Sequence, residues 1–528
     1  MLDNGLSAHE ASDATREGNP MLRPYQPPVI SLGDQSVFET LVRRDHWVRR
    51  AERYIDFLRL REVVEEFYTA DFGCPGIEPV LLIKLELLMY HDNLSDSQVF
   101  QRVETDLAYR WFLGLGRNDY LPDKSTLGRF RARLGAEGFR KLFHALLGQA
   151  REHGLIRDRL RIKDATHVIA DIAVPAGLTL VAQARNRLLS AAQPFDGEYV
   201  AAERIRIETI RTSTDTRADD VRLMARIEHL RDILAWTDAI ETPVDAESNP
   251  TWQALVTARE IARKTLAGHD DPQAGDKLRS VSDPDARRGR HGEFYDGYML
   301  DVMIDADSHF FTAVNVLPAS GNESADALVL VEQETSAHGN TIEKLSIDGA
   351  GFDGPVLRKL EEEHGIDVFV PAKASSTPDR FAPEDFTLSE DGSHVTCPAG
   401  QRSQYRQRDE AKHGTSYRFD KAVCQQCPLF KQCIGKPQKH GRTVRINDYA
   451  PEYARVRERA QTEQYAAVKQ EHPAVERGLG HLMNRYGGRR ARYRGLGRVL
   501  SQQLMGATTA NINRMIRLLD NREAVAFA

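Results

Sequence analysis

Apolar residues recur at helical spacing through residues 38–154. One long apolar run begins after Pro79, a residue favoured in the first turn of a helix, and it contains no helix breaker. A second run follows, with Ser95 or Asp96 as its N-cap and Gly114 near its end. The pattern therefore predicts a helical domain in this part of the chain.

A further short helix is predicted over residues 122–135, and it is basic. Its arginines are Arg129, Arg131 and Arg133. Several short helices of which the last is basic are typical of helix-turn-helix-like modules that bind DNA. The alternative is a helical bundle whose arginine face is simply solvated.

The pattern changes to strand-like alternation at residues 160–174. Leu160, Ile162, Thr166 and Val168 fall on one face of this predicted strand, and Asp164 falls on the same face. A carboxylate among apolar neighbours is costly to bury without a partner. Asp164 is therefore a candidate for a specific role.

Further strands follow after a charged interval. Residues 295–318 predict a hairpin, and a helix is expected near residues 325–334. A strand ending at Asp348, a helix starting near Pro355 and a strand over residues 366–373 then form a βαβ unit with parallel strands. The fold class is therefore α/β, with a mixed sheet and helices at both ends of the chain.

Two insertions interrupt this core. The first is charged and helical, with an apolar stripe at Leu223, Ile227, Leu230 and Leu234, and we expect a helical hairpin that is a structural excursion. We expect the following segments: an extended or disordered N-terminus (1–36), a helical DNA-binding domain (37–154), the α/β core (155–175 and 280–378), the helical insertion (176–279), a cysteine-rich insertion (379–446) and C-terminal helices completing the core (447–528).

Composition adds limits to this picture. A chain of 528 residues, 41% hydrophobic and 28% charged, is typical of a globular protein with two to four domains. It has no apolar run long enough to span a membrane and no signal-peptide pattern at its start, so a cytoplasmic protein without a membrane partner is expected. The net charge is −6, yet residues 477–498 hold seven arginines and no acid, which suits phosphate contacts.

Asp348 lies where open α/β sheets bind ligands, at the carboxyl end of a parallel strand. Gly349 and Gly351 allow a tight turn there and leave room beside the carboxylate. Two carboxylates from neighbouring strands, Asp348 and Asp164, would repel each other unless a cation lay between them, and Mg²⁺ prefers such oxygens. Asp353 precedes Gly354 and Pro355 and is predicted to be a helix N-cap.

A third acid is expected from a C-terminal helix. Glu476 lies at the edge of an apolar stripe in the predicted helix 473–486, and the segment after that helix is the most basic part of the chain. Phosphate-contacting residues beside a metal ligand suit a polynucleotide substrate. The alternative is a surface acid in the first turn of a helix, where the helix dipole favours it.

Four of the five cysteines fall within 37 residues, whereas Cys74 stands alone. One CxxC pair with two further cysteines indicates a structural, tetrahedral Zn²⁺ site, with free thiols as the alternative. His413 or His440 could replace one cysteine as a ligand. The expected ligands are Cys397, Cys424, Cys427 and Cys433.

In their order along the chain, these segments resemble bacterial insertion-sequence transposases of the DDE type. The resemblance rests on a helical N-terminal domain containing LIKLELLMYHDN and on IKDATHVIAD, LSIDGAGFD and VERGLGHLMNRYGG. It implies an RNase H-like catalytic core in which Asp164, Asp348 and Glu476 hold two Mg²⁺ ions. It also implies cleavage of double-stranded DNA at the terminal inverted repeats of an insertion sequence, strand transfer into target DNA, and a homodimer on DNA.

The same resemblance implies a set of arginines that bind DNA. They are Arg129, Arg131, Arg133, Arg477, Arg485, Arg489, Arg490, Arg492, Arg494 and Arg498. The sequence also departs from the family pattern. Relatives often have an arginine four residues before the glutamate and a lysine seven after it, where this chain has His472 and Met483. Arg477 or Arg485 could supply the lost charge, and Glu471 is the alternative glutamate.

Two other functions fit parts of the sequence. His472 and Met483 favour a transposase-derived protein that binds DNA but has lost catalysis. A zinc-dependent hydrolase using the cysteine cluster is the third possibility, but four cysteine ligands would leave Zn²⁺ no open position for chemistry.

Overall fold

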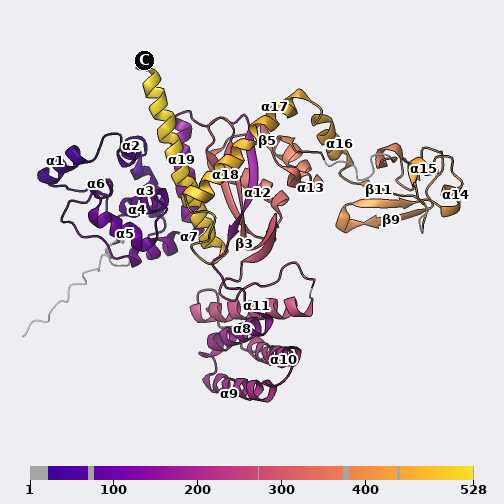
Figure 1. Cartoon of the computed structure of the whole chain (residues 1–528), viewed down its shortest axis with the longest axis horizontal. Coiled ribbons are helices and arrows are strands. Elements are labelled where there is room, and N and C mark those ends of the chain that lie inside the picture. The colour runs from indigo at the N-terminus through magenta and orange to yellow at the C-terminus, as the bar shows by residue number, and fades with distance from the viewer. Residues whose placement is uncertain (1–21, 69–75, 272, 373–379, 437–439, 527–528) are drawn as a thin grey trace, which may run out of the picture. The chain divides into compact units, whose positions relative to one another are not determined.

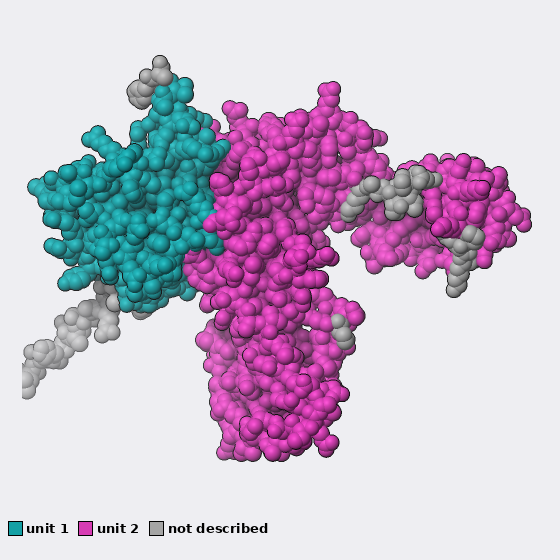
Figure 2. Space-filling view, in the orientation of Figure 1, with its two compact units in different colours: residues 1–153, 485–487, 504–528 teal, residues 154–484, 488–503 magenta. Residues whose placement is uncertain are grey.

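The computed structural model describes residues 22–68, 76–271, 273–372, 380–436 and 440–526. The chain divides into two compact units (Figure 2). The first contains residues 1–153, 485–487 and 504–528, and the second contains residues 154–484 and 488–503. Cys74 and residues 1–21 lie outside the described residues, and so does most of the N-terminal segment that was expected to be extended.

The first unit is helical, as the apolar spacing predicts (Figure 1). Helix α4 begins at Pro79, is capped by Glu78 and is buried on almost every side, which explains its nearly continuous apolar sequence. The helices of its N-terminal part are α1 (Leu32–Leu41), α2 (Trp47–Tyr54), α3 (Phe57–Glu65), α4 (Pro79–His91), α5 (Asp96–Thr105), α6 (Leu107–Leu113) and α7 (Ser125–Glu152).

Capping residues set several of these boundaries. Ser95 caps α5 in a capping box with Gln98, and Gly114 ends α6 in the left-handed conformation at φ 70°. The run expected as one helix is two, because the Asp106 side chain accepts hydrogen bonds from two backbone amides and starts α6. Helix α1 begins at Leu32, inside the segment expected to be extended.

The second unit is built on a six-stranded mixed sheet. Strand β1 pairs with β3 in antiparallel fashion and with β5 in parallel, and β5 pairs with β6 in parallel, so the predicted hairpin and βαβ unit are both confirmed. The strands are β1 (Arg161–Ile169), β2 (Arg287–His291), β3 (Glu293–Asp305), β4 (Phe311–Pro318), β5 (Lys344–Ser346) and β6 (Asp367–Phe369).

Helices α12 (Glu323–His338) and α13 (Gly354–Arg358) complete the core around this sheet. Leu330 and Val331 of α12 pack with Met303 of β3 and Leu345 of β5, and all of these side chains are buried. This packing fixes the start of α12 beside the strands. The position of the sheet relative to α12 matters for the site described below.

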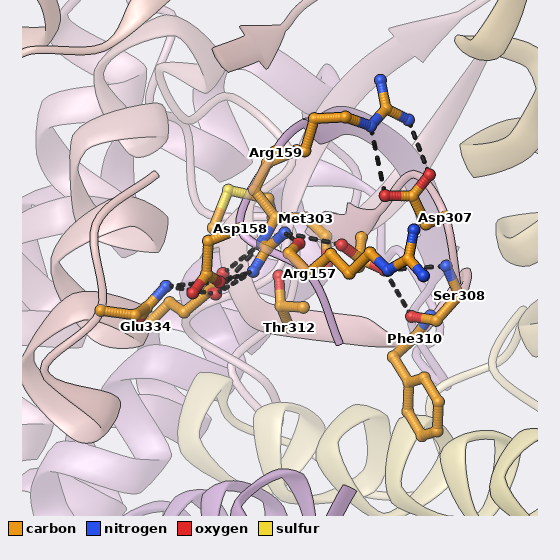
Figure 3. A network of polar contacts seen from close by, with 12 residues as sticks. Arg157, Asp158, Arg159, Met303, Asp307, Ser308, Phe310, Thr312 and Glu334 are labelled. Atoms are coloured by element: carbon orange, nitrogen blue, oxygen red, sulfur yellow. Dashed lines mark hydrogen bonds and ion pairs between the residues drawn. The ribbon is translucent and has the colours of Figure 1, made fainter. Parts of the chain in front are cut away.

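The other face of β1 carries the buried side chains of Arg161 and Lys163. Arg161 is fully buried and donates to Glu334 of α12 at 2.6 and 2.9 Å, to Asp305 of β3 at 2.8 Å and to Asp158 at 2.7 Å. Figure 3 shows Asp158 and Glu334 converging within this network, with the Arg159–Asp307 pair nearby. Buried charge pairing therefore joins three elements of the core.

The helical insertion is larger than the hairpin that the sequence predicted. It consists of four helices, α8 (Gly177–Ala192), α9 (Gly197–Thr214), α10 (Asp219–Asp238) and α11 (Pro250–Asp270). The hairpin prediction was wrong because it used only the stripe of α10. Ile227, Leu230 and Leu234 of that stripe pack against α8 and α11 in a hydrophobic core of the insertion itself.

Residues 380–436 and 440–447 form small sheets with a core of their own. That core contains Phe386, Val395, Tyr417, Phe419 and Val444. The elements are β7 (Thr387–Leu388), β8 (Val395–Thr396), β9 (Tyr405–Asp409), β10 (Gly414–Arg418), α14 (Lys421–Gln425), α15 (Phe430–Cys433) and β11 (Thr443–Asn447).

Four helices close the chain. They are α16 (Ala450–Arg459), α17 (Glu463–Glu471), α18 (Pro473–Arg485) and α19 (Leu496–Ala526). Among the helices of the described residues, none combines the length and the apolar composition that crossing a bilayer requires.

Candidate active site

Asp164 lies in the middle of β1, opposite Val302 of β3. Its neighbours on the same strand face, Ile162 and Val168, are fully buried, whereas the Asp164 side chain is only partly buried. Its carboxylate accepts a hydrogen bond of 2.9 Å from the backbone amide of Ala165. The predicted strand and its apolar face are therefore confirmed over Arg161–Ile169, although the strand ends five residues earlier than predicted, and Asp164 is the residue of that face that opens toward solvent.

Asp348 follows the last residues of β5, beside β1 in the sheet. Its carboxylate accepts a hydrogen bond of 2.9 Å from the amide of Ala350 and so starts a 3₁₀ turn over residues 349–351. A side chain at Gly349 would meet open space, whereas one at Gly351 would collide with Ile347. Gly349 therefore leaves room beside Asp348, and Gly351 is needed for close packing.

Asp353 has the structural role that its sequence context predicts. It caps α13 by accepting a hydrogen bond from the amide of Val356. This role separates it from Asp348, five residues earlier, whose carboxylate belongs to a cluster of acids.

The third member of that cluster is Glu323, the first residue of α12. One carboxylate oxygen each of Asp164, Glu323 and Asp348 lies within 4.8 Å of the other two. Asn322 caps α12 with its side chain and so fixes the start of the helix at Glu323. Three carboxylates at this spacing offer the oxygen ligands that a hard divalent cation prefers.

The charges of this cluster are poorly compensated by the protein. Burial, together with the negative charges of Asp348 and Glu323, raises the pKa of Asp164 to about 6, although the hydrogen bond from Ala165 and the charge of Lys163 oppose the shift. A bound cation would favour the ionised carboxylates and remove this cost.

Lys163 connects the cluster to the buried side of the sheet. Its ammonium nitrogen lies 2.8 Å from Asp301 of β3 and 3.5 Å from Glu323, and both Lys163 and Asp301 are buried. Lys163 thus pairs with the Glu323 side chain and also with the buried carboxylate of Asp301.

Helix α17 and His472, the residue before α18, lie beside β5. Lys469 donates to the carbonyl oxygen of Ile347 at 2.6 Å and to Ser346 at 3.2 Å, and the His472 ring lies 3.0 Å from the Ser346 hydroxyl. Burial lowers the pKa of Lys469 to about 8, although the charge of Asp348 opposes the shift. Burial also lowers the pKa of His472 to about 4, so this ring is neutral at pH 7.

Glu476, the acid expected from the C-terminal helix, is exposed in the first turn of α18. It is not one of the three acids that converge, and its role as a metal ligand stays a prediction. The alternative, Glu471, is held by Arg159 at 2.8 Å. Met483, which occupies the position where relatives often have a lysine, is buried in the apolar face of α18.

The arginines expected to bind DNA have different surroundings. Arg131 pairs with Glu86 and Asp96 at 2.7 Å, and Arg489 donates to the carbonyl oxygen of His167 at 2.6 Å, so both have structural contacts. Arg133 lies over the Tyr68 ring. Arg492 is partly buried, and the exposed members are Arg129, Arg477, Arg485, Arg490, Arg494 and Arg498. DNA contact by this set stays a prediction.

The sequence did not predict two residues of the site, the acid Glu323 and the nearby Lys469. Glu323 follows Asn322 at a helix start, which reads as an ordinary N-terminal acid, and only the packing of α12 brings it to the sheet edge. Lys469 lies three residues before His472, so its charge occurs near the position of the missing arginine. A search for nearby compensating charges would have found Lys469, whereas no sequence signal marks Glu323.

Comparison with known protein families identifies two domains. The family described as Transposase domain (DUF772) matches residues 36–133, and the family described as Transposase DDE domain matches residues 396–516, which include Glu476. No curated protein and no solved structure matches the chain. The two matches occur in the order that the sequence resemblance predicted, and together they support a DDE-type insertion-sequence transposase.

Proposed function

We propose that this protein binds the terminal inverted repeats of an insertion sequence and catalyses Mg²⁺-dependent DNA strand cleavage and strand transfer. The observation that carries the proposal is the convergence of Asp164, Glu323 and Asp348 at the edge of the sheet. In a chain with two transposase domains, such a cluster is best explained as the site of phosphoryl transfer.

The donor set fits Mg²⁺. All three side chains are carboxylates, and the room beside Gly349 leaves space for water or substrate oxygens. We propose that Asp164, Asp348 and Glu323 hold one ion and that Glu476 helps to hold a second. When bound, the ions activate the nucleophilic oxygen and stabilise the leaving oxygen of the scissile phosphate.

The surrounding residues have supporting roles. Lys163 orients Glu323, and Lys469 places a positive charge beside Asp348. The mixed sheet, in which β1 is antiparallel to β3 and parallel to β5, supports an RNase H-like core. Because transposition joins two element ends, we expect two copies of the chain to act together on DNA.

A transposase-derived DNA-binding protein without catalysis is the second candidate. The buried Met483 favours it, since no lysine is present at that position. The position of Lys469 favours the active enzyme, because this lysine supplies a positive charge beside Asp348. Lys469 lies on α17, whereas Met483 lies on α18.

The cleavage assay that tests the proposal uses a duplex ending in the repeat that flanks this protein's own coding sequence. We expect the parent protein to nick it in Mg²⁺ and not in EDTA. Glu323→Gln and Glu476→Gln should each lower the rate by at least about 100-fold, because each removes a charged ligand. Glu471→Gln is the matched control and should change the rate only slightly, since Glu471 pairs with Arg159.

Each outcome decides between the candidates. A parent protein that binds the duplex without nicking it would establish the non-catalytic alternative. Parent-like activity of Glu323→Gln would remove Glu323 from the ligand set. Parent-like activity of Glu476→Gln would instead leave the three converging acids as the complete set.

We also propose a structural Zn²⁺ in the cysteine-rich segment. Its four thiols line one cavity, together with Phe386 and Phe419, and none of them is in a disulfide. His413 and His440 do not line this cavity, which favours the four-cysteine ligand set. Burial raises the pKa of the Cys424 and Cys433 thiols, and the neighbouring thiols add to the shift, so a cation is needed for the thiolates to form.

We expect protein purified from zinc-supplemented cells to contain about one Zn²⁺ per chain, as a four-cysteine site binds a single ion. Cys424→Ser should lose this zinc and should melt at a lower temperature, because the segment has only a small apolar core. Elemental analysis and thermal unfolding check both points. Cys74→Ser is the control and should keep the metal. Zinc retained by Cys424→Ser, or absent from the parent protein, would contradict the proposal.

A further inference from the structure

The hairpin of β2 and β3 extends beyond its neighbour in the sheet. Strand β1 ends at Ile169, opposite Gly297, whereas β2 and β3 continue to pair with each other as far as His291 and Glu293. A single residue, Gly292, makes the turn with φ 71°. Residues 287–296 therefore form a two-stranded ribbon, and among the described residues no third strand pairs with it on the β1 side, where the Ala170 amide donates a single hydrogen bond to the carbonyl oxygen of Asp296.

This ribbon carries an exposed aromatic ring between two cations. The Phe294 side chain is 62% exposed. The guanidinium carbons of Arg288 and Arg290 lie 4.8 and 5.6 Å from the centre of its ring. Arg290 donates a hydrogen bond of 3.3 Å to the carbonyl oxygen of Gly292. Both arginines are exposed, and no ion pair with a carboxylate is found for either among the described residues, so both charges are available to a ligand.

The ribbon contacts the strand that carries Asp164. The His167 ring of β1 lies 5.0 Å from the His291 ring and 5.1 Å from the Tyr295 ring. Arg489 donates to Thr166 and to the carbonyl oxygen of His167, which fixes this end of β1. The ribbon therefore contacts β1 at a residue only three positions from Asp164 in the strand.

The chemistry of the ribbon suits an unpaired base and its phosphates. An exposed aromatic face stacks on any base, and guanidinium groups contact phosphates and strengthen stacking. A cross-strand contact alone would not require Phe294 and both arginines to remain mostly exposed.

We propose that the β2–β3 ribbon binds single-stranded DNA next to the cleavage site, with Phe294 stacked on an unpaired base and Arg288 and Arg290 on the flanking phosphates. The inference rests on the proposed transposase function, because it takes DNA to be the ligand of the neighbouring acids.

The test uses the full chain in an Asp164→Asn background, so that DNA is bound but not cut. The probe is a duplex with a single-stranded extension that contains 2-aminopurine, whose fluorescence falls when the base stacks on an aromatic ring. Phe294→Ala should remove this quenching and weaken binding about 5- to 100-fold, the range expected for loss of one stacked base. Phe294→Trp should restore both.

Tyr405→Ala provides a matched control, since Tyr405 is also an aromatic residue of a strand and is 62% exposed. It should leave quenching and affinity unchanged. Replacing Arg288 and Arg290 together by alanine should reduce the slope of log affinity against log salt by about 1.4, or about 0.7 for each phosphate contact.

The outcomes separate this inference from the proposed function. Parent-like quenching and affinity in Phe294→Ala, with binding by the parent intact, would overturn the role of the ribbon and leave the transposase function standing. Failure of the parent to bind any DNA would overturn both. Loss of affinity in Phe294→Ala without loss of quenching would also exclude stacking by Phe294.

Discussion

Asp164→Asn is expected to abolish Mg²⁺-dependent cleavage, lowering the rate by at least about a thousandfold, while DNA binding persists. The reason is that Asp164 is the strand residue whose oxygen lies within reach of both Asp348 and Glu323, so its charge is needed to hold a cation among them. Asp348→Asn should have the same effect. The measurement is the rate of strand nicking together with the affinity for the same duplex.

The same substitution is expected to stabilise the metal-free protein at pH 8 and not at pH 4. Burial raises the pKa of Asp164 from an ordinary value of 3.8 to about 6, so the folded protein binds this proton more tightly than the unfolded chain. The contribution of Asp164 to stability therefore falls as the pH rises from about 4 to about 6, and its full cost remains above pH 6. The asparagine side chain does not ionise, so the stability of Asp164→Asn does not change with pH through this residue.

Thermal unfolding at pH 8 and at pH 4 checks the expected direction of this change in stability. Mg²⁺ should raise the melting temperature of the parent protein at pH 8 and should have little effect on Asp164→Asn. Asp353→Asn is the control, because asparagine caps a helix as well as aspartate does and the Asp353 side chain serves α13. An Asp164→Asn protein that nicks DNA at the parent rate, or that is less stable than the parent at pH 8, would contradict the assignment.

Arg161→Leu is expected to destabilise the second unit by about 3–5 kcal/mol. Arg161 is fully buried, and its removal would leave the carboxylates of Glu334 and Asp305 in the core without their cation. The loss should appear as a lower midpoint of urea unfolding measured by circular dichroism. Glu334→Gln should be milder than Arg161→Leu, because it leaves the pair of Arg161 with Asp305 in place.

Arg159→Leu is the matched control for this prediction. Arg159 also pairs with two carboxylates, those of Asp307 and Glu471, but its side chain is 40% exposed, so the free energy of unfolding should change by about 1 kcal/mol or less. Equal midpoints for Arg161→Leu and Arg159→Leu would mean that burial of the Arg161 network does not stabilise the fold.

Much of the fold follows from local patterns. Period-two alternation gave β1, the hairpin of β3 and β4 and the βαβ unit, and caps such as Ser95 and Asp353 mark helix starts in the sequence. The helical insertion was only partly predictable. One apolar stripe indicated a helix. The packing of this helix, α10, with three other helices depends on contacts between segments far apart in the chain.

The part of the candidate site that could be predicted consists of the two carboxylates that lie on predicted strands or at their ends. Asp164 and Asp348 could be recognised because a carboxylate on the apolar face or at the end of a predicted strand needs an explanation. Glu476 was chosen from a helix pattern and from a family resemblance, and it is exposed on α18. The role of Glu476 in the site stays a prediction, which the cleavage assay tests. The proximity of Glu323 to both aspartates is a result of the structure.

The sequence by itself determined the α/β class and the helical N-terminal part, and it indicated the two candidate aspartates and the resemblance to transposases, because each depends on residue order or short-range periodicity. Only the tertiary structure decided that Arg161 and Lys163 are buried in ion networks, that α12 brings Glu323 to the two aspartates and that Lys469 lies beside Asp348. Apart from Glu323 and Asp348, which are 25 positions apart, these relations join residues separated by more than 100 positions. The packing of helices against the sheet creates them, and no local pattern encodes such distances.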